Sequence, residues 1–149
     1  MVAQAWVVFN KAKKKIGNTT LNLAATVYRM SLLTSTWTPN LTLSTYSQVL
    51  ANEVTEANGY SSSGKALTSE RWTSISTVTQ YAFDVDDVVW TGTGGAINGI
   101  KYACIWISAA TTANRHLLCY SQLTSGQFNL QQNNTLTIQI NAAGVLTLQ

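Results

Sequence analysis

Residues 26–33, TVYRMSLL, decide the fold class that the sequence predicts. Successive side chains of an extended chain point to opposite faces, so alternate positions share a face. Tyr28, Met30 and Leu32 then lie on one face, which we expect to be directed toward a core, and the positions between them form the other. The alternation therefore predicts a β-strand with one buried face.

Seven further runs have the composition or the alternation of strands. Turn residues separate them: glycines follow Trp90, and Asn141 and Gly144 lie between the last two runs, which we expect to form a closing hairpin. About eight short strands of this kind predict a mainly β chain, with residues 1–149 forming one antiparallel β-sandwich domain. Its strand order is jelly-roll-like or immunoglobulin-like, and the sequence leaves both open. The seven runs are residues 71–78, 80–83, 88–90, 97–107, 116–122, 136–140 and 145–148.

The N-terminal segment has a helical pattern instead. In residues 4–15 the apolar side chains recur at helical spacing, and three consecutive lysines near the end complement the negative end of a helix dipole. Gly17 is a typical terminating residue. We therefore predict a short α-helix and an N-terminal helical arm over residues 1–17. Residues 46–54 fit either a short helix or an irregular segment.

The composition excludes several classes of protein. Of the 149 residues, 46% are hydrophobic and 10% charged, and five Trp and six Tyr are unlike a disordered chain. No apolar run approaches the roughly 20 residues of a membrane helix, so we expect no membrane partner. The net charge is +3, but four of the nine basic residues lie within residues 11–15. Because nucleic-acid binders usually spread basic residues over a face, we expect no nucleic-acid partner.

No motif for catalysis or cofactor binding stands out. His116 is the single histidine, and no nucleophile motif accompanies it. Residues 92–95, GTGG, lack the helix and lysine of a phosphate loop, so they predict a wide turn. Asp84 and Asp86 could hold a hard cation weakly, but a solvated acidic bend is the simpler interpretation. We therefore predict no enzyme, no catalytic residue, no cofactor and no metal, and a carbohydrate-acting enzyme or lectin stays a distant alternative.

The two cysteines belong to neighbouring predicted strands. If residue 107 pairs with residue 116 in an antiparallel hairpin, Cys104 lies directly opposite Cys119. Opposed positions approach disulfide distance. The basic cluster follows the N-terminal apolar stretch, the reverse of a signal peptide, so we expect a reducing compartment. The prediction is two buried thiols without a bond.

Several segments resemble a widespread family of small structural proteins of tailed bacteriophages. The matching segments keep their order and cover most of the chain. They are FNKAKKKIG at 9–17, YRMSLLTS at 28–35, TPN at 38–40, ANEV at 51–54 followed by GY at 59–60, FDVDDVVW at 83–90, and the closing stretch 136–148. The resemblance implies a virion protein: a capsid decoration (cement) protein, or a component of the neck or tail.

For a decoration protein the expected partners are the major capsid protein and further copies of the chain, for example in a trimer. It would be made in the cytoplasm of the bacterial host and lie on the head surface of the virion. A tail or neck protein could instead bind a host receptor through residues 60–64 and 92–95. We expect Trp72, Trp90 and Trp106 to pack in the core. The expected interface residues, with the two tryptophans exposed, are Trp6, Phe9, Lys11, Lys13, Lys14, Lys15 and Trp37.

Overall fold

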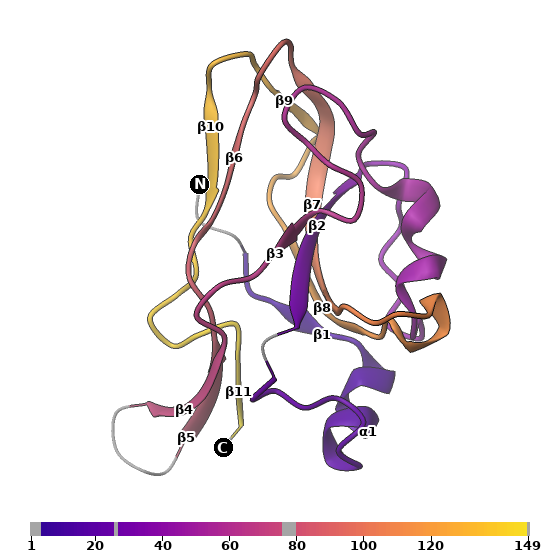
Figure 1. Ribbon diagram of the computed structural model, residues 1–149, viewed down its shortest axis with the longest axis vertical. Helices are drawn as coiled ribbons and strands as arrows, with labels where there is room; N and C mark the ends of the chain where they lie inside the picture. Colours follow the sequence, from indigo (N-terminus) through magenta and orange to yellow (C-terminus); the bar gives the residue numbers. More distant parts are fainter. Residues whose placement is uncertain (1–3, 26, 76–79, 149) are drawn as a thin grey trace.

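The first layer of the structure is a six-stranded antiparallel sheet (Figure 1). The computed structural model describes residues 4–25, 27–75 and 80–148. Thr26, residues 1–3 of the predicted arm and residues 76–78 of one predicted strand therefore lie outside the described residues. In spatial order the sheet contains β1 (Val7–Val8), β8 (Leu117–Gln122), β7 (Ile97–Ile107), β2 (Tyr28–Thr34) and β3 (Lys65–Ala66), and β9 (Phe128–Leu130) also pairs with β7.

The second layer is a ribbon of two smaller antiparallel sheets. One has the order β11-β5-β4, and the other pairs β10 with β6. Since β5 leads into β6, and β10 into β11, the two sheets follow one another along the left side of Figure 1. The two layers confirm the predicted antiparallel β-sandwich. The bounds are β4 (Arg71–Ile75), β5 (Gln80–Asp84), β6 (Val88–Thr91), β10 (Thr135–Ile138) and β11 (Leu146–Leu148).

The predicted closing hairpin is wrong. Leu136 of β10 pairs with Trp90 of β6, whereas Leu146 of β11 pairs with Phe83 of β5. The chain between β10 and β11 bends without folding back, because β5 and β6 together form one long template. Each of the last two strands gains a fully buried aromatic partner on that template, since Trp90 and Phe83 are both 0% exposed.

Strand β2 is buried on both faces, not on one. Tyr28, Met30 and Leu32 are in the core as predicted, but Ser31 and Leu33 on the opposite face are also fully buried. The second face is covered by the segment that contains the 3-10 helices η1 (Tyr46–Gln48) and η2 (Leu50–Asn52), seen at the right of Figure 1. The short helical turns agree with one of the two alternatives for residues 46–54.

The N-terminal helix is shorter than predicted. Helix α1 spans Asn10–Gly17, and the residues before it form β1, which pairs with β8. Val7 and Val8 are β-branched residues that favour a strand when an edge is free to receive them. The amide of Phe9 continues this pairing by donating to the carbonyl of Leu118 at 3.1 Å. The arm is therefore a strand and a helix attached to the domain.

The predicted register of the two cysteines is wrong by one residue. The amide of Ile107 donates to the carbonyl of His116 at 2.9 Å, but a bulge follows, after which Ile105 pairs with Cys119 and Cys104 with Tyr120. Paired residues share a face, so the two thiols lie on opposite faces of the sheet. Both cysteines are free and buried.

We expect the native protein to keep both thiols reduced and protected. Burial raises the pKa of Cys104 and of Cys119, and a protonated thiol is a poor nucleophile. Alkylation with iodoacetamide should add no mass to the native protein and two adducts after unfolding in urea. An intact mass two daltons lower before reduction than after it would contradict the register described here.

Candidate docking surface

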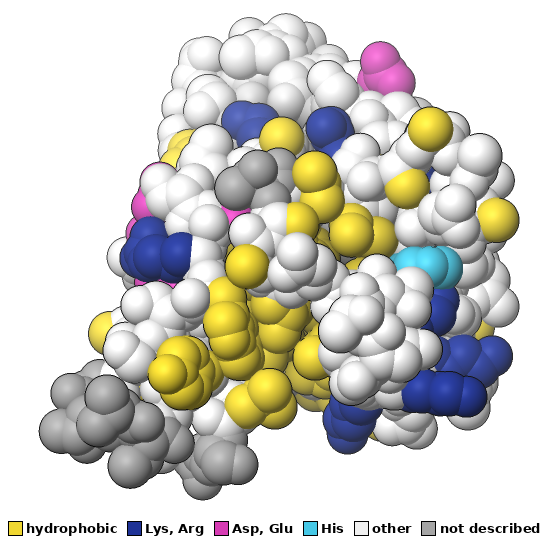
Figure 2. Space-filling view, turned by 60° about the horizontal axis from the view of Figure 1, so that its bottom comes forward, with side chains coloured by type: hydrophobic (Ala, Val, Ile, Leu, Met, Phe, Trp, Pro, Cys, Tyr) yellow, Lys and Arg dark blue, Asp and Glu magenta, His cyan; other side chains and the backbone are white. Residues whose placement is uncertain are grey.

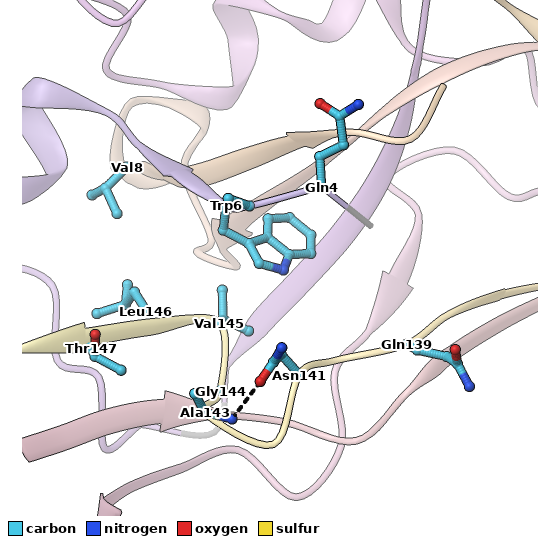
Figure 3. A pocket seen from close by; sticks show the side chains of 11 residues that line it. Gln4, Trp6, Val8, Gln139, Asn141, Ala143, Gly144, Val145, Leu146 and Thr147 are labelled. Atoms are coloured by element: carbon cyan, nitrogen blue, oxygen red, sulfur yellow. Dashed lines mark hydrogen bonds between the residues drawn. The ribbon is translucent and has the colours of Figure 1, made fainter. Parts of the chain in front are cut away.

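A groove runs between two sheet edges, β1 and β11. Its lining combines apolar side chains with the polar ones of Gln4, Gln139, Asn141 and Thr147. Within the described part of the chain, β1 pairs only with β8 and β11 pairs only with β5. A hollow of about 520 Å³ separates them, with Trp6 and Val8 on one side and Val145 and Leu146 on the other (Figure 3). The β-sandwich is therefore open along this seam.

The groove continues toward α1 and β4. A second hollow of about 210 Å³ lies between Val8, Ile16 and β11, and a third of about 390 Å³ lies between Ile16 and Trp72. Leu148 of β11, which lines the second hollow, is 50% exposed. Figure 2 shows apolar side chains gathered at this end of the molecule, beside lysine and arginine side chains. We call this surface the seam groove; its apolar residues are Trp6, Val8, Ile16, Trp72, Val145, Leu146 and Leu148.

Helix α1 places a cluster of cations at one end of the seam groove. Lys13 lines the hollow between α1 and β11. Its neighbours Lys11 and Lys14 are exposed, and Lys15 is half-buried. Among the described residues the single ion pair joins Arg71 to Asp84, so the helix lysines have no anionic partner there. The result is a local positive potential that the fold does not neutralise.

The carboxylates that could neutralise these lysines are used elsewhere. All six acidic side chains accept hydrogen bonds within the chain, away from α1. The donors are the Tyr60 hydroxyl to Glu53, the Ser62 amide to Glu56, the Tyr28 amide to Glu70, the Arg71 guanidinium to Asp84, the Ser69 hydroxyl to Asp86, and the Ile140 amide to Asp87. Through Asp86 and Asp87, the acidic bend after β5 thus links separate segments of the second layer by hydrogen bonds. In the described part of the chain, no group of three or more His, Cys, Asp or Glu side chains could hold a metal ion.

Lys15 joins α1 to the end of β8. Its ammonium lies 2.5 Å from Nδ1 of His116 and donates to the Ser44 hydroxyl at 3.1 Å. Burial and then the Lys15 charge lower the pKa of His116, while burial and then Lys11 lower the pKa of Lys15. The imidazole is therefore a neutral acceptor that fixes the orientation of the helix lysine.

This contact predicts a loss of stability in mild acid. An unfolded histidine takes up a proton near pH 6.5, while the folded His116 resists protonation beside Lys15. Below that pH the unfolded state binds more protons, so the free energy of unfolding falls as the pH falls. We expect the Tm to drop between pH 7.5 and 5.5, and the drop to be smaller in His116→Gln, which keeps an acceptor for Lys15. Equal pH profiles for the two proteins would contradict this contact.

The structure places some of the residues predicted for the interface at the seam groove and others in the core. Trp6 and Lys13 line the seam groove, and Lys11, Lys14 and Lys15 lie beside it on α1. Phe9, however, is 0% exposed, so its side chain is part of the core and offers no free contact surface. The expectation that Trp37 is exposed is wrong, because the side chain is 4% exposed.

Trp37 is buried because two tyrosines pack against it. Its ring packs edge-on against Tyr102 and Tyr120, with centroid distances of 5.0 Å in both cases. These tyrosines come from β7 and β8, far along the sequence. Of the tryptophans predicted to be in the core, Trp90 and Trp106 are buried as expected, but Trp72 is half-buried and faces the seam groove.

The sequence analysis missed Ile16, Leu146 and Leu148 as surface residues. The alternating run that contains β11 was a signal for a strand, but nothing in it showed that the strand would form an edge. None of the helices in the described ranges has the length and apolar character of a membrane span. Comparisons with family models, with curated proteins and with solved structures found no match to this chain.

Proposed function

We propose that this protein is a bacteriophage capsid decoration protein that docks on the assembled head through the seam groove and the lysines of α1. The observation that carries the proposal is the groove itself: a seam with apolar side chains, open between two strand edges, beside lysines that form no ion pair within the described ranges of the chain. Apolar surface combined with uncompensated charge is typical of a protein interface. The resemblance to phage structural proteins implies that the partner is the major capsid protein.

Such a protein would stabilise the shell by mass action. A ligand that binds only the assembled lattice shifts the assembly equilibrium toward that lattice. Symmetry then repeats the contact over the head, and small oligomers at threefold positions would suit this arrangement. No covalent chemistry is needed for this role, because the whole effect comes from the binding free energy.

The location of the protein in the particle tests this proposal. Cryo-electron microscopy of virions of the phage that encodes it should show copies spread over the head. Quantitative gel analysis of the same particles should give a copy number similar to that of the capsid lattice positions. Density restricted to the neck or tail, or a copy number near six or twelve, would refute the decoration role.

A second candidate is a tail or neck protein that binds a host receptor, and one observation favours it. Asn58, which lies two residues before the first loop expected for that role, contacts the second loop: the amide of Thr93 donates to the carbonyl of Asn58 at 2.9 Å, and the Asn58 side chain donates at 2.8 Å to the carbonyl of Ala96, which follows that loop. A hollow of about 300 Å³, lined in part by Asn58 and Ala96, adjoins this contact. Loss of host adsorption after mutation of Thr93, with heads of normal stability, would support this candidate.

A further inference from the structure

We infer that the seam groove binds an extended segment of another protein as an added β-strand along β1, with acidic residues at the end that meets α1. This inference deepens the proposed function, on which it rests for the origin of the segment in the capsid lattice. It specifies the chemistry of the partner: an alternating apolar stretch with a neighbouring acidic pair.

The edge of β1 provides the hydrogen-bonding groups for such a strand. The amides of Gln4 and Phe9 are directed toward β8, where they donate to the carbonyls of Gln122 and Leu118. In an antiparallel ladder the residues between bonded positions direct their amides and carbonyls to the other side. Val8, next to Phe9, therefore presents its backbone groups away from β8. Unpaired strand edges are the usual templates for strand addition.

The side chains beside this edge fit an extended apolar segment. Val8 pairs with Cys119, and Trp6, two residues before it, shares its face. Val145 and Leu146 close the groove from the other layer, as Figure 3 shows. A segment with an apolar residue at every second position would place these side chains between the two layers and its polar ones toward solvent.

The charge of the groove selects a partner other than a second copy of this chain. Lys13 lines the groove where β1 ends, and an acidic residue there would provide a counter-charge that residues 4–25, 27–75 and 80–148 do not supply. A second copy is a poorer fit, because each chain has a net charge of +3 and the lysine clusters of two copies would repel one another. The occupant is therefore an acidic segment of a different protein.

Synthetic peptides test this inference with the full chain. Fluorescein-labelled Asp-Glu-Val-Thr-Val-Thr-Val places its acidic pair beside α1 if it runs antiparallel to β1, and Val-Thr-Val-Thr-Val-Glu-Asp does so if it runs parallel. Fluorescence anisotropy should show that one of them binds at least about tenfold more tightly than the same peptide with two lysines in place of the acids. Proline at the central position of the bound peptide should weaken binding, because it removes a backbone donor.

Charge-exchanged variants locate the binding site. The double variant Lys13→Glu and Lys14→Glu changes only exposed side chains, so the fold should persist, and it should now prefer the lysine peptide. The matched control Lys101→Glu, on a strand outside the groove, should keep the preference for the acidic peptide. Trp6→Ala should weaken both peptides. An unchanged preference in the double variant would place the acidic site elsewhere and overturn the inference.

The remaining outcomes are also decisive. Binding of none of the peptides would overturn the inference even if cryo-electron microscopy places the protein on heads. Self-association in sedimentation velocity that Trp6→Ala abolishes would show that a second copy fills the groove, which would also overturn it. Selective peptide binding by a protein that is absent from heads would refute the decoration role. It would still support the inference that the seam groove binds an extended acidic segment.

Discussion

Replacement of Trp106 by alanine is expected to lower the free energy of unfolding by about 3–5 kcal/mol, the usual cost of removing a buried large aromatic side chain. Trp106 is 1% exposed, and its ring stacks on Tyr46 with a centroid distance of 4.0 Å and an interplanar angle of 13°. Its Nε1 donates to the Ser31 hydroxyl at 3.0 Å, and that hydroxyl donates to the Tyr46 hydroxyl at 3.2 Å. The substitution leaves a cavity and removes the hydrogen-bond donor to Ser31.

Urea unfolding followed by circular dichroism measures this loss of free energy. Thermal unfolding should show the same loss as a Tm lowered by about 2–4 °C per kcal/mol for a domain of this size. Trp106→Phe separates the two contributions: it keeps an aromatic ring but not the donor, so we expect a smaller loss than for alanine. Val89→Ala is the exposed control, with an expected change within about 0.5 kcal/mol. A loss below about 1 kcal/mol in Trp106→Ala would mean that η1 does not cover this face of the sheet.

Gly64→Ala is expected to destabilise the protein as strongly, through the backbone. Gly64 has φ of +61°, where an L side chain is strained, and an added Cβ would lie 2.0 Å from the carbonyl oxygen of Met30. Met30 belongs to β2, which lies between β7 and β3 in the sheet, and it is fully buried, so it cannot move aside. The clash would push away β3, whose Lys65 pairs with Met30. We expect a loss of about 4 kcal/mol or more, or no folded protein.

The matched control is Gly126→Ala. No atom lies within 4 Å of a Cβ at this position, and the backbone is outside the left-handed region, so the change should be within about 0.5 kcal/mol. Thermal unfolding of the two variants, with soluble yield as a second readout, compares them directly. A Gly64→Ala protein as stable as the control would show that the loop before β3 does not lie against β2.

The local sequence pattern was sufficient to predict the bounds of a long strand. The run at residues 97–107 was predicted with the bounds that β7 has, because it is rich in apolar and β-branched residues and glycines precede it. Pattern failed where a partner far along the chain decides the structure. Val8 fits the apolar stripe of a helix, but β8 offers an edge, and pairing with it outweighs a short helical extension. The buried face around Ser31 was missed for a similar reason, since η1 covers it.

The sequence by itself determined that the chain forms antiparallel strands, that Trp90 and Trp106 lie in the core and that lysines gather near the N-terminus, because periodicity and composition are local properties. Only the tertiary structure decided which apolar side chains stay on the surface. Val8 and Leu146 come from opposite ends of the chain, and they face one another because β8 and β5 hold β1 and β11 as the outer strands of two different sheets. Whether a strand lies at an edge depends on its pairing with strands far along the chain. A local sequence pattern carries no information about that pairing.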